Sequence, residues 1–257
     1  MTSFPVPYYQ DDYATIYHAD ARDVLNRLGE RFDAVVTSPP YNLNTRVNQQ
    51  RQYISRGHKD YEFSTKYGTY SDDLHPDEYL AFTSDVLAHC QRMSEFVFWN
   101  VQVATGNKTA LWRMIGENHG TLKELIVWDK GEGQPAMKDR TLNSAVEYIL
   151  VFSSSDPRTR QFKDATFERG TLGNIWRIPP SRSIREHGAT FPSGLVHRCF
   201  SLCNPEVVMD PFCGTGTTLR VAKDVGRRSI GIEVNERYCE IAAERLSQEV
   251  LPFEGAK

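Results

Sequence analysis

Residues 207–218 read "VVMDPFCGTGTT", and this stretch decides which fold the whole chain is expected to adopt. A short apolar run ends at Asp210, and Gly214 and Gly216 follow a few positions later. Glycine lets the backbone approach a ligand closely and adopt φ values that other residues disfavour. The pattern predicts a buried strand that leads directly into a ligand-binding turn.

The residues after this turn extend it to a strand–helix–strand unit. Thr217 and Thr218 offer hydroxyls and an N-cap for a helix over 219–226, and a second strand over 228–234 contains Glu233 near its end. A carboxylate at the tip of the second strand binds the ribose diol in nucleotide-binding βαβ units. Glu233 is therefore a candidate ribose ligand.

Three ligands compete for this unit. A nucleoside triphosphate would require a lysine after Gly216, and a dinucleotide would require a glycine where Leu219 stands. S-adenosylmethionine has a ribose and an adenine, carries positive charge and lacks phosphate. Asp210 at the strand end suits such a cation better than a pyrophosphate, so the unit favours S-adenosylmethionine.

Strands and helices alternate along the rest of the chain, which predicts one α/β domain with a mostly parallel sheet. Two irregular segments, 43–75 and 153–190, interrupt the alternation. Further strands are expected at 15–20, 32–36, 95–101, 124–130, 146–153 and 206–210. Further helices are expected at 21–29, 76–92, 108–118, 192–203 and 236–250.

Composition is that of an ordinary globular protein. The 257 residues are 40% hydrophobic and 25% charged, the net charge is −3, and no apolar run approaches a membrane span. The first residues have neither the basic start nor the apolar centre of a signal peptide, so a soluble cytoplasmic protein is expected. The five cysteines form no C-x-x-C pair and are expected to be small buried groups.

A second motif, "VTSPPYN" at 36–42, follows the strand "FDAVV". One interpretation is a stiff turn without further meaning, and the other is a rigid platform for a flat substrate. Pro39 and Pro40 fix their φ angles, so the Ser38 hydroxyl and the Pro39 carbonyl could accept hydrogen bonds from a substrate at little entropic cost. The ring of Tyr41 could stack on a base, and its hydroxyl is expected to matter little.

The two motifs together resemble those of the S-adenosylmethionine-dependent amino DNA methyltransferases, which methylate cytosine N4 or adenine N6. The family's catalytic pattern, [DNS]-P-P-[YFW], is matched by Ser38–Tyr41, and its cofactor pattern, D-P-F-x-G-x-G-T-T, by Asp210–Thr218. The catalytic block comes first, as in the group called beta. The resemblance implies a circularly permuted, Rossmann-like sheet of seven strands, in a single methyltransferase domain over 1–257.

The resemblance also implies roles for individual residues. "YHAD" resembles the block whose acid, here Asp20, meets the adenine, although Ala19 replaces the usual glycine. "HGATFPSGLVHR" resembles the block before the glycine turn, with Phe191 where lysine is common. The implied catalytic residues are Ser38, Pro39, Pro40 and Tyr41. The implied cofactor residues are Asp20, Thr37, His187, Phe191, Pro192, Asp210, Pro211, Phe212, Gly214, Gly216, Thr217, Thr218, Glu233 and Val234.

The target base and the reaction follow partly from chemistry. Methylation at cytosine carbon 5 uses a cysteine nucleophile, usually in a Pro-Cys pair, and the sequence contains no such pair. No metal is required. Family members with serine before Pro-Pro favour cytosine N4, with adenine N6 as the alternative. Methylation of RNA or of a protein amide, and a catalytically silent binding module, are the other hypotheses.

Duplex DNA is the expected partner, and a base in a duplex must be flipped out to reach such a site. Both irregular segments contain more basic than acidic residues, so 43–75 is expected to face DNA and 153–190 to recognise the target sequence. The candidate DNA-binding residues are Arg46, Arg51, Arg56, Arg177, Arg182 and Arg185. A cognate restriction endonuclease and a homodimer are further expectations that the resemblance raises.

Overall fold

The computed structural model describes residues 4–42, 74–134, 139–140, 142–181 and 192–249. Its strands are β1 Tyr9–Gln10, β2 Ala14–His18, β3 Phe32–Thr37, β4 Ser94–Val101, β5 Leu122–Gln134, β6 Ser144–Ser153, β7 Ile175–Arg177, β8 Val207–Asp210 and β9 Arg228–Glu233. Its helices are α1 Ala21–Leu25, α2 Pro76–Met93, α3 Lys108–Glu117, α4 Ser193–Cys203, α5 Thr217–Asp224 and α6 Glu236–Ser247.

Within these residues all strands join one sheet in the order β1-β2-β9-β8-β3-β4-β6-β5-β7. The run β2-β9-β8-β3-β4 is parallel, whereas β6 is antiparallel to both β4 and β5. The α/β class is confirmed. The sheet has nine strands instead of the seven expected, because the short strands β1 and β7 extend its two ends.

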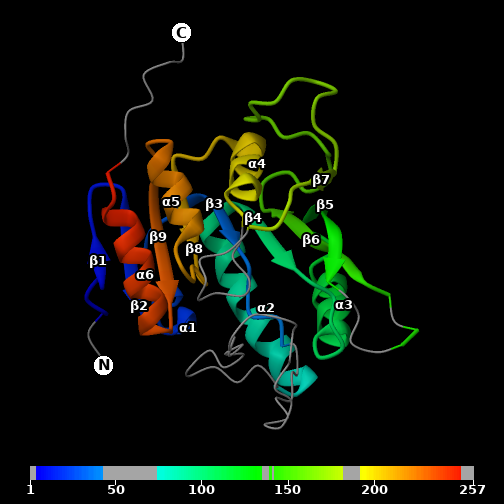
Figure 1. Ribbon diagram of the computed structural model, residues 1–257, viewed down its shortest axis with the longest axis horizontal. Helices are drawn as coiled ribbons and strands as arrows, with labels where there is room; N and C mark the ends of the chain where they lie inside the picture. Colours follow the sequence, from blue (N-terminus) through cyan, green and yellow to red (C-terminus); the bar gives the residue numbers. More distant parts are fainter. Residues whose placement is uncertain (1–3, 43–73, 135–138, 141, 182–191, 250–257) are drawn as a thin grey trace, which may run out of the picture.

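The position of β8 agrees with a permuted chain order. β8 comes late in the sequence, yet it pairs with β3 on one side and β9 on the other. In Figure 1 the first strands of the chain and the C-terminal helix α6 lie together at one end of the sheet, and β5 and β7 lie at the other. The two motifs are thus brought side by side by the sheet.

Helices cover both faces of the sheet. One apolar cluster joins α1, α2 and α3 to one face and includes Trp99, Leu150 and Phe152. A second cluster joins α4 and α5 to the opposite face and includes Phe98 of β4 and Trp176 of β7. The central strands are buried on both sides because each face has its own helical layer.

The helices that follow the neighbouring strands β3 and β8 pack on opposite faces of the sheet. The helix after β8, α5, packs in the second cluster, and the helix after β9, α6, packs beside it in a third cluster that includes Leu219 and Ala242. The helices after β2 and β4 pack in the first cluster. Ligands of open α/β sheets bind outside the carboxyl ends of the strands at such a switch point. Both sequence motifs begin at this point.

Most predicted elements agree with the structure, with three corrections. Helix α1 ends at Leu25, with Asn26 as its C-cap, and is shorter than the predicted 21–29. The N-cap of α5 is Gly216, at φ 77°, so the predicted threonine cap is wrong. The segment 153–190, predicted to be irregular, contributes the strand β7, which pairs in parallel with β5.

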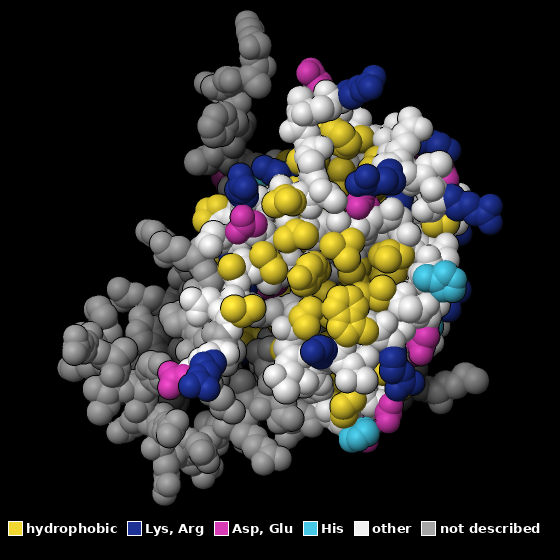
Figure 2. All heavy atoms as spheres, turned by 90° about the vertical axis from the view of Figure 1, so that its right-hand side faces the viewer, with side chains coloured by type: hydrophobic (Ala, Val, Ile, Leu, Met, Phe, Trp, Pro, Cys, Tyr) yellow, Lys and Arg dark blue, Asp and Glu magenta, His cyan; other side chains and the backbone are white. Residues whose placement is uncertain are grey.

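The end of the sheet at β5 and β7 exposes apolar side chains. Figure 2 shows them gathered over the face that lies on the right in Figure 1. Ile175 of β7 is 58% exposed and Trp112 of α3 is 51% exposed. The homodimer suggested by the resemblance stays a prediction. No helix in the described part of the chain has the length and apolar character needed to cross a membrane.

Candidate active site

The glycine turn between β8 and α5 has the backbone geometry that the sequence predicted. Gly214 and Gly216 have φ values of 51° and 77°, in the left-handed region. A Cβ atom on Gly216 would lie 2.9 Å from the Cβ of Ala242, whereas one on Gly214 would meet nothing within 4 Å. Gly216 is thus required for packing against α6, and the open side of Gly214 leaves room for a ligand.

Two buried carboxyl groups flank this turn. Burial raises the pKa of Asp210 to about 6, against hydrogen bonds from the Thr37 hydroxyl and the Phe212 N–H. Burial also raises the pKa of Glu233 to about 7, although its oxygens accept the N–H groups of Gly214 at 2.9 Å and Asn235 at 2.8 Å. We name Asp210, Gly214, Gly216 and Glu233 the cofactor pocket, after the ligand-binding role that the sequence predicts for them.

The chemistry of this pocket fits S-adenosylmethionine. A cation beside Asp210 would compensate a carboxylate that burial otherwise disfavours, and a ribose diol could donate to the oxygens of Glu233. The open side of Gly214 allows close backbone contact with such a ligand.

Two other predicted cofactor residues, Asp20 and Val234, lie next to the pocket and have structural partners. Asp20 caps α1, accepts the Arg22 N–H at 2.9 Å and pairs with the Arg22 guanidinium at 2.7 Å. It follows β2, whose His18 is level with Glu233 of β9. The carbonyl of Val234 accepts a hydrogen bond from the His18 ring at 3.1 Å.

The remaining residues of the glycine motif are mostly packed. Phe212 lies against Phe82 and Trp99, with ring centroids 5.8 and 6.3 Å apart. Thr218 donates to the Val36 carbonyl at 3.3 Å, and Thr217 is buried. Pro211 is buried in the turn and Pro192 is buried as the N-cap of α4. His187 and Phe191 lie outside the described residues.

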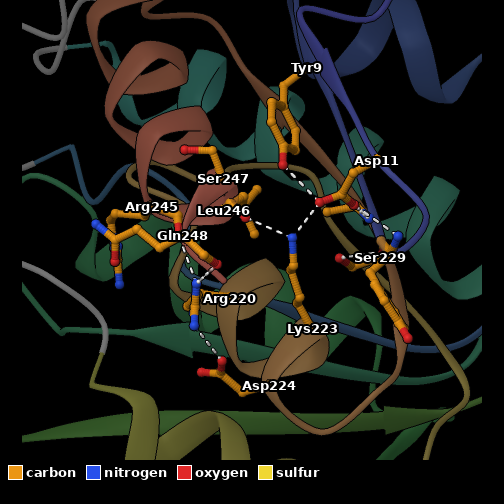
Figure 3. Close-up of polar contacts among 12 residues, drawn as sticks. Tyr9, Asp11, Arg220, Lys223, Asp224, Ser229, Arg245, Leu246, Ser247 and Gln248 are labelled. Atoms are coloured by element: carbon orange, nitrogen blue, oxygen red, sulfur yellow. Dashed lines mark hydrogen bonds and ion pairs between the residues drawn. The ribbon is translucent and has the colours of Figure 1, made fainter. Parts of the chain in front are cut away.

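Charged side chains of α5 and α6 join the helix after the glycine turn to neighbouring elements, and Figure 3 shows the contacts of Arg220, Lys223 and Asp11. Arg245 of α6 donates to the carbonyl of Thr215 within the turn. Arg220 of α5 donates to the Arg245 carbonyl at 2.8 Å, and Lys223 binds Asp11 beside β1. The N-terminal strand and the C-terminal helix are thus anchored to the helix that follows the turn.

The second motif forms a turn held from several sides. The Tyr79 hydroxyl donates to the Pro40 carbonyl at 2.8 Å, and the Asn107 amide donates to the Tyr41 carbonyl at 2.7 Å. The Ser38 hydroxyl lies 2.8 Å from the Tyr41 hydroxyl. This turn is fixed by hydrogen bonds as well as by its two prolines.

Besides the bond from Thr218 to Val36, a shorter hydrogen bond joins the two motifs directly. The hydroxyl of Thr37, the residue before Ser38, donates to a carboxylate oxygen of Asp210 at 2.7 Å. The two residues are 173 positions apart in the sequence. The turn that begins at Ser38 is therefore attached directly to Asp210, at the start of the glycine turn.

Besides Tyr79 and Asn107, sequence reasoning missed three side chains of a polar network that begins at the turn. Glu147 of β6 accepts the Tyr41 hydroxyl at 2.8 Å, Asn100 of β4 donates to both, and Lys130 of β5 pairs with Glu147 at 3.0 Å. The side chains of Lys130 and Glu147 are only 10% and 9% exposed. We call Ser38, Tyr41, Asn100, Glu147 and Lys130 the acceptor network.

The pleat of the sheet explains how these residues meet. Four neighbouring strands each place two apolar residues of the second cluster on the same face of the sheet. The next residue on that face, two positions closer to the edge where the serine turn lies, is polar. The series are Ala34–Val36–Ser38, Phe96–Phe98–Asn100, Val151–Ile149–Glu147 and Ile126–Trp128–Lys130. Because β6 runs antiparallel to β4, the first residues of β6 lie at this edge. A sequence search limited to the carboxyl ends of strands therefore misses Glu147.

The predicted DNA-binding residues are only partly described. Arg177, at the end of β7, has a side chain 84% exposed and lies 3.4 Å from Asp129. Arg46, Arg51, Arg56, Arg182 and Arg185 lie outside the described residues, as does most of 43–75. Within the described part of 153–190, Arg160 pairs with Glu124 at 2.6 Å, so some of the basic residues there have acidic partners.

Comparison with known proteins identifies the family of this chain. The N6_N4_Mtase family, described as DNA methylase, matches residues 32–244. A type II methyltransferase, M.ScaI of Streptomyces caespitosus, is 28% identical over 95% of this chain and 84% of its own length. The structure of the PvuII cytosine-N4-specific DNA methyltransferase superposes with a TM-score of 0.72 at 19% identity, covering 96% of this chain and 91% of that one.

A further solved structure shares the fold and contains a ligand. The complex of M1.HpyAVI with SAM superposes with a TM-score of 0.57 at 18% identity, covering 90% of this chain and 99% of that one. The family match spans both motifs, β3 with its serine turn and β8 with its glycine turn. The chain belongs to the N6_N4_Mtase family of DNA methylases.

Proposed function

We propose that this protein transfers the methyl group of S-adenosylmethionine to the exocyclic amine of a base flipped out of duplex DNA, with cytosine N4 as the favoured target. The observation that supports it most strongly is the hydrogen bond from Thr37 to Asp210. It holds an amine-binding turn and a pocket suited to a cationic nucleoside against each other at the switch point of the sheet.

The proposed role of each residue is as follows. S-adenosylmethionine supplies an electrophilic methyl group on a sulfonium and leaves as a neutral thioether. Ser38 Oγ and the Pro39 carbonyl accept hydrogen bonds from the amine, which withdraws its lone pair from the ring and directs it at the methyl group. Tyr41 is a stacking surface for the base, and Asp210 and Glu233 bind the cofactor. Much of the rate arises from positioning.

Two considerations favour cytosine over adenine. Ser38 occupies the position where the resembling family has serine for cytosine N4 and aspartate or asparagine for adenine N6. The PvuII enzyme, named as cytosine-N4-specific, has the higher TM-score of the two superposed structures. Adenine N6 is the second candidate, and RNA or a protein amide is the third.

The proposed partner is double-stranded DNA, met in the cytoplasm. Segment 153–190, with Arg177, Arg182 and Arg185, is the proposed target-recognition region, and 43–75, with Arg46, Arg51 and Arg56, is a second proposed DNA-facing region. A cognate restriction endonuclease is a further prediction, since M.ScaI is named as a type II methyltransferase.

Product analysis tests this function. The protein is incubated with methyl-labelled S-adenosylmethionine and, separately, duplex DNA, RNA or bulk protein, and labelled DNA is digested to nucleosides for mass analysis. The expected product is N4-methylcytosine in DNA. N6-methyladenine would select the second candidate. Label only in RNA or protein, or 5-methylcytosine in DNA, would contradict the proposal.

A further inference from the structure

The acceptor network is a continuous chain of hydrogen bonds from the turn into the sheet. Ser38 Oγ lies 2.8 Å from the Tyr41 hydroxyl, which lies 2.8 Å from Glu147 Oε2. The other oxygen of Glu147 is 3.0 Å from the Lys130 ammonium. Every link is short enough for a proton to pass along it.

The direction of these bonds follows from the donors available. Asn100 Nδ2 lies 2.7 Å from Glu147 Oε2 and 2.6 Å from the Tyr41 hydroxyl, so its two hydrogens serve these two acceptors. Rotating this amide by 180° would place its oxygen against the carboxylate, acceptor against acceptor. The carboxylate also receives the proton of the Tyr41 hydroxyl.

This assignment fixes the hydroxyl of Ser38 as well. Because the Tyr41 proton is directed at Glu147, the hydrogen bond between Ser38 and Tyr41 must use the Ser38 proton. Of its two lone pairs, one receives at most a long hydrogen bond from Asn100 Nδ2, at 3.4 Å, and the other can accept a hydrogen bond from a target amine. Glu147 thus orients Ser38 through Tyr41 without being its neighbour.

The contribution of the buried Lys130–Glu147 ion pair to stability does not explain why the pair is present. Removing a lysine and a glutamate from water costs several kcal/mol for each ion, and apolar replacements of such pairs are often neutral or stabilising. Here the pair lies at the sheet edge, next to the serine turn, where the apolar stripes of four strands end. A role in the reaction accounts for that position.

We propose that Glu147 is a positioning residue at the end of a proton relay, Ser38–Tyr41–Glu147, which removes the proton that the target amine loses on methylation. This inference rests on the proposed function. The amine nitrogen bonds to the methyl carbon, and the electron pair of the broken carbon–sulfur bond stays on sulfur. The amine proton passes to Ser38, the Ser38 proton to Tyr41, and the Tyr41 proton to Glu147. Nothing is oxidised or reduced.

The test compares Tyr41→Phe and Glu147→Gln with the wild-type protein in single-turnover methyl transfer to duplex DNA. Each variant removes one link of the relay, so the transfer rate should fall by about 100-fold. The affinities for S-adenosylmethionine and DNA, measured by calorimetry and by filter binding, should change less than about threefold, because neither change touches the cofactor pocket. The wild-type rate should fall in heavy water, and both variants should lose this isotope effect.

Two further variants separate the relay from a structural role. Tyr79→Phe removes another tyrosine hydroxyl bonded to the same turn and should keep the isotope effect. The double variant Glu147→Gln with Lys130→Met has no unpaired buried charge, so it should fold, and it should be as slow as Glu147→Gln. Recovery of the rate in the double variant would mean that only charge balance matters, and would overturn the relay.

Other outcomes are also decisive. Wild-type rates in Tyr41→Phe or Glu147→Gln, or a wild-type isotope effect in either, would contradict the relay while leaving the proposed function intact. A wild-type protein that binds S-adenosylmethionine but transfers no label to DNA would contradict the proposed function, and the relay with it.

Discussion

The cofactor pocket and the acceptor network lie at the same edge of the sheet but are constructed differently. The pocket comes from one continuous strand–helix–strand unit and depends on backbone conformation and two carboxyl groups. The network combines two side chains of the turn after β3 with one side chain from each of β4, β5 and β6, and it depends on the register of these strands. One half of an active site can thus come from a single short stretch of sequence, while the other half combines residues that are far apart in the sequence.

Substitutions in the network should therefore lower the transfer rate, whereas substitutions in the pocket should lower cofactor affinity. The largest effect is expected at the serine turn. Ser38→Ala removes an acceptor used mainly in the transition state, which should cost about 2–4 kcal/mol, or roughly 30- to 1000-fold in transfer rate. Cofactor affinity should stay unchanged, because Thr37 retains its bond to Asp210. Stopped reactions with labelled cofactor measure the rate. An undiminished rate in Ser38→Ala would remove this residue from the site.

The next effect concerns the cofactor pocket. Asp210→Asn keeps an acceptor for Thr37 but removes the charge, so affinity for S-adenosylmethionine should fall by about 3 kcal/mol, or roughly 100-fold, in calorimetry. Because burial raises the pKa of Asp210 to about 6 from 3.8, the ionised form opposes folding at pH 8 by about 3 kcal/mol. The variant without cofactor should melt at the same or a higher temperature. Wild-type affinity in this variant would contradict the role of Asp210.

The same raised pKa predicts how cofactor binding depends on pH. The stability that the protonated carboxyl contributes without ligand is present at low pH and is lost as the pH rises through about 6. A cationic ligand favours the ionised form, so its affinity should fall below pH 6 by up to about tenfold per pH unit. Calorimetry in buffers of different ionisation enthalpy should detect proton release on binding. A flat profile between pH 5 and about 8 would contradict this linkage.

The smallest effect is expected on DNA binding. Changing Arg177, Arg182 and Arg185 together to alanine should lower the salt slope of DNA affinity by about one for each lost phosphate contact. Cofactor affinity should stay constant. Arg237→Ala, on α6 near the opposite end of the sheet, is the matched control and should keep the wild-type slope (Figure 1). A triple variant with the same slope as this control would identify the three arginines as ordinary surface residues.

Much of the pocket could be predicted from the sequence because its determinants are local. Gly214, Gly216 and Glu233 lie within one βαβ unit, and the left-handed φ values of the two glycines follow from residue type. The Ser38–Tyr41 turn was predictable for the same reason. The helix cap at Gly216 was not predicted, because threonine hydroxyls there have other partners, such as the Val36 carbonyl.

The rest of the site could not be predicted, because it depends on pairing between distant strands. Nothing near Glu147 in the sequence distinguishes it from a glutamate on an exposed strand face. Only the antiparallel pairing of β6 with β4, which places Asn100 level with Ile149, brings it to the turn. The expectation that the Tyr41 hydroxyl matters little also changes, since Ser38, Asn100 and Glu147 all contact it.

The most direct test of the central claim, that the two halves have separate roles in one reaction, measures single-turnover transfer to duplex DNA at saturating S-adenosylmethionine for Asp210→Asn and Ser38→Ala side by side. The account predicts that Asp210→Asn, once saturated, transfers methyl groups within about threefold of the wild-type rate, whereas Ser38→Ala stays roughly 30- to 1000-fold slow. Equal loss of transfer in both saturated variants would contradict the division between a binding pocket and an acceptor network.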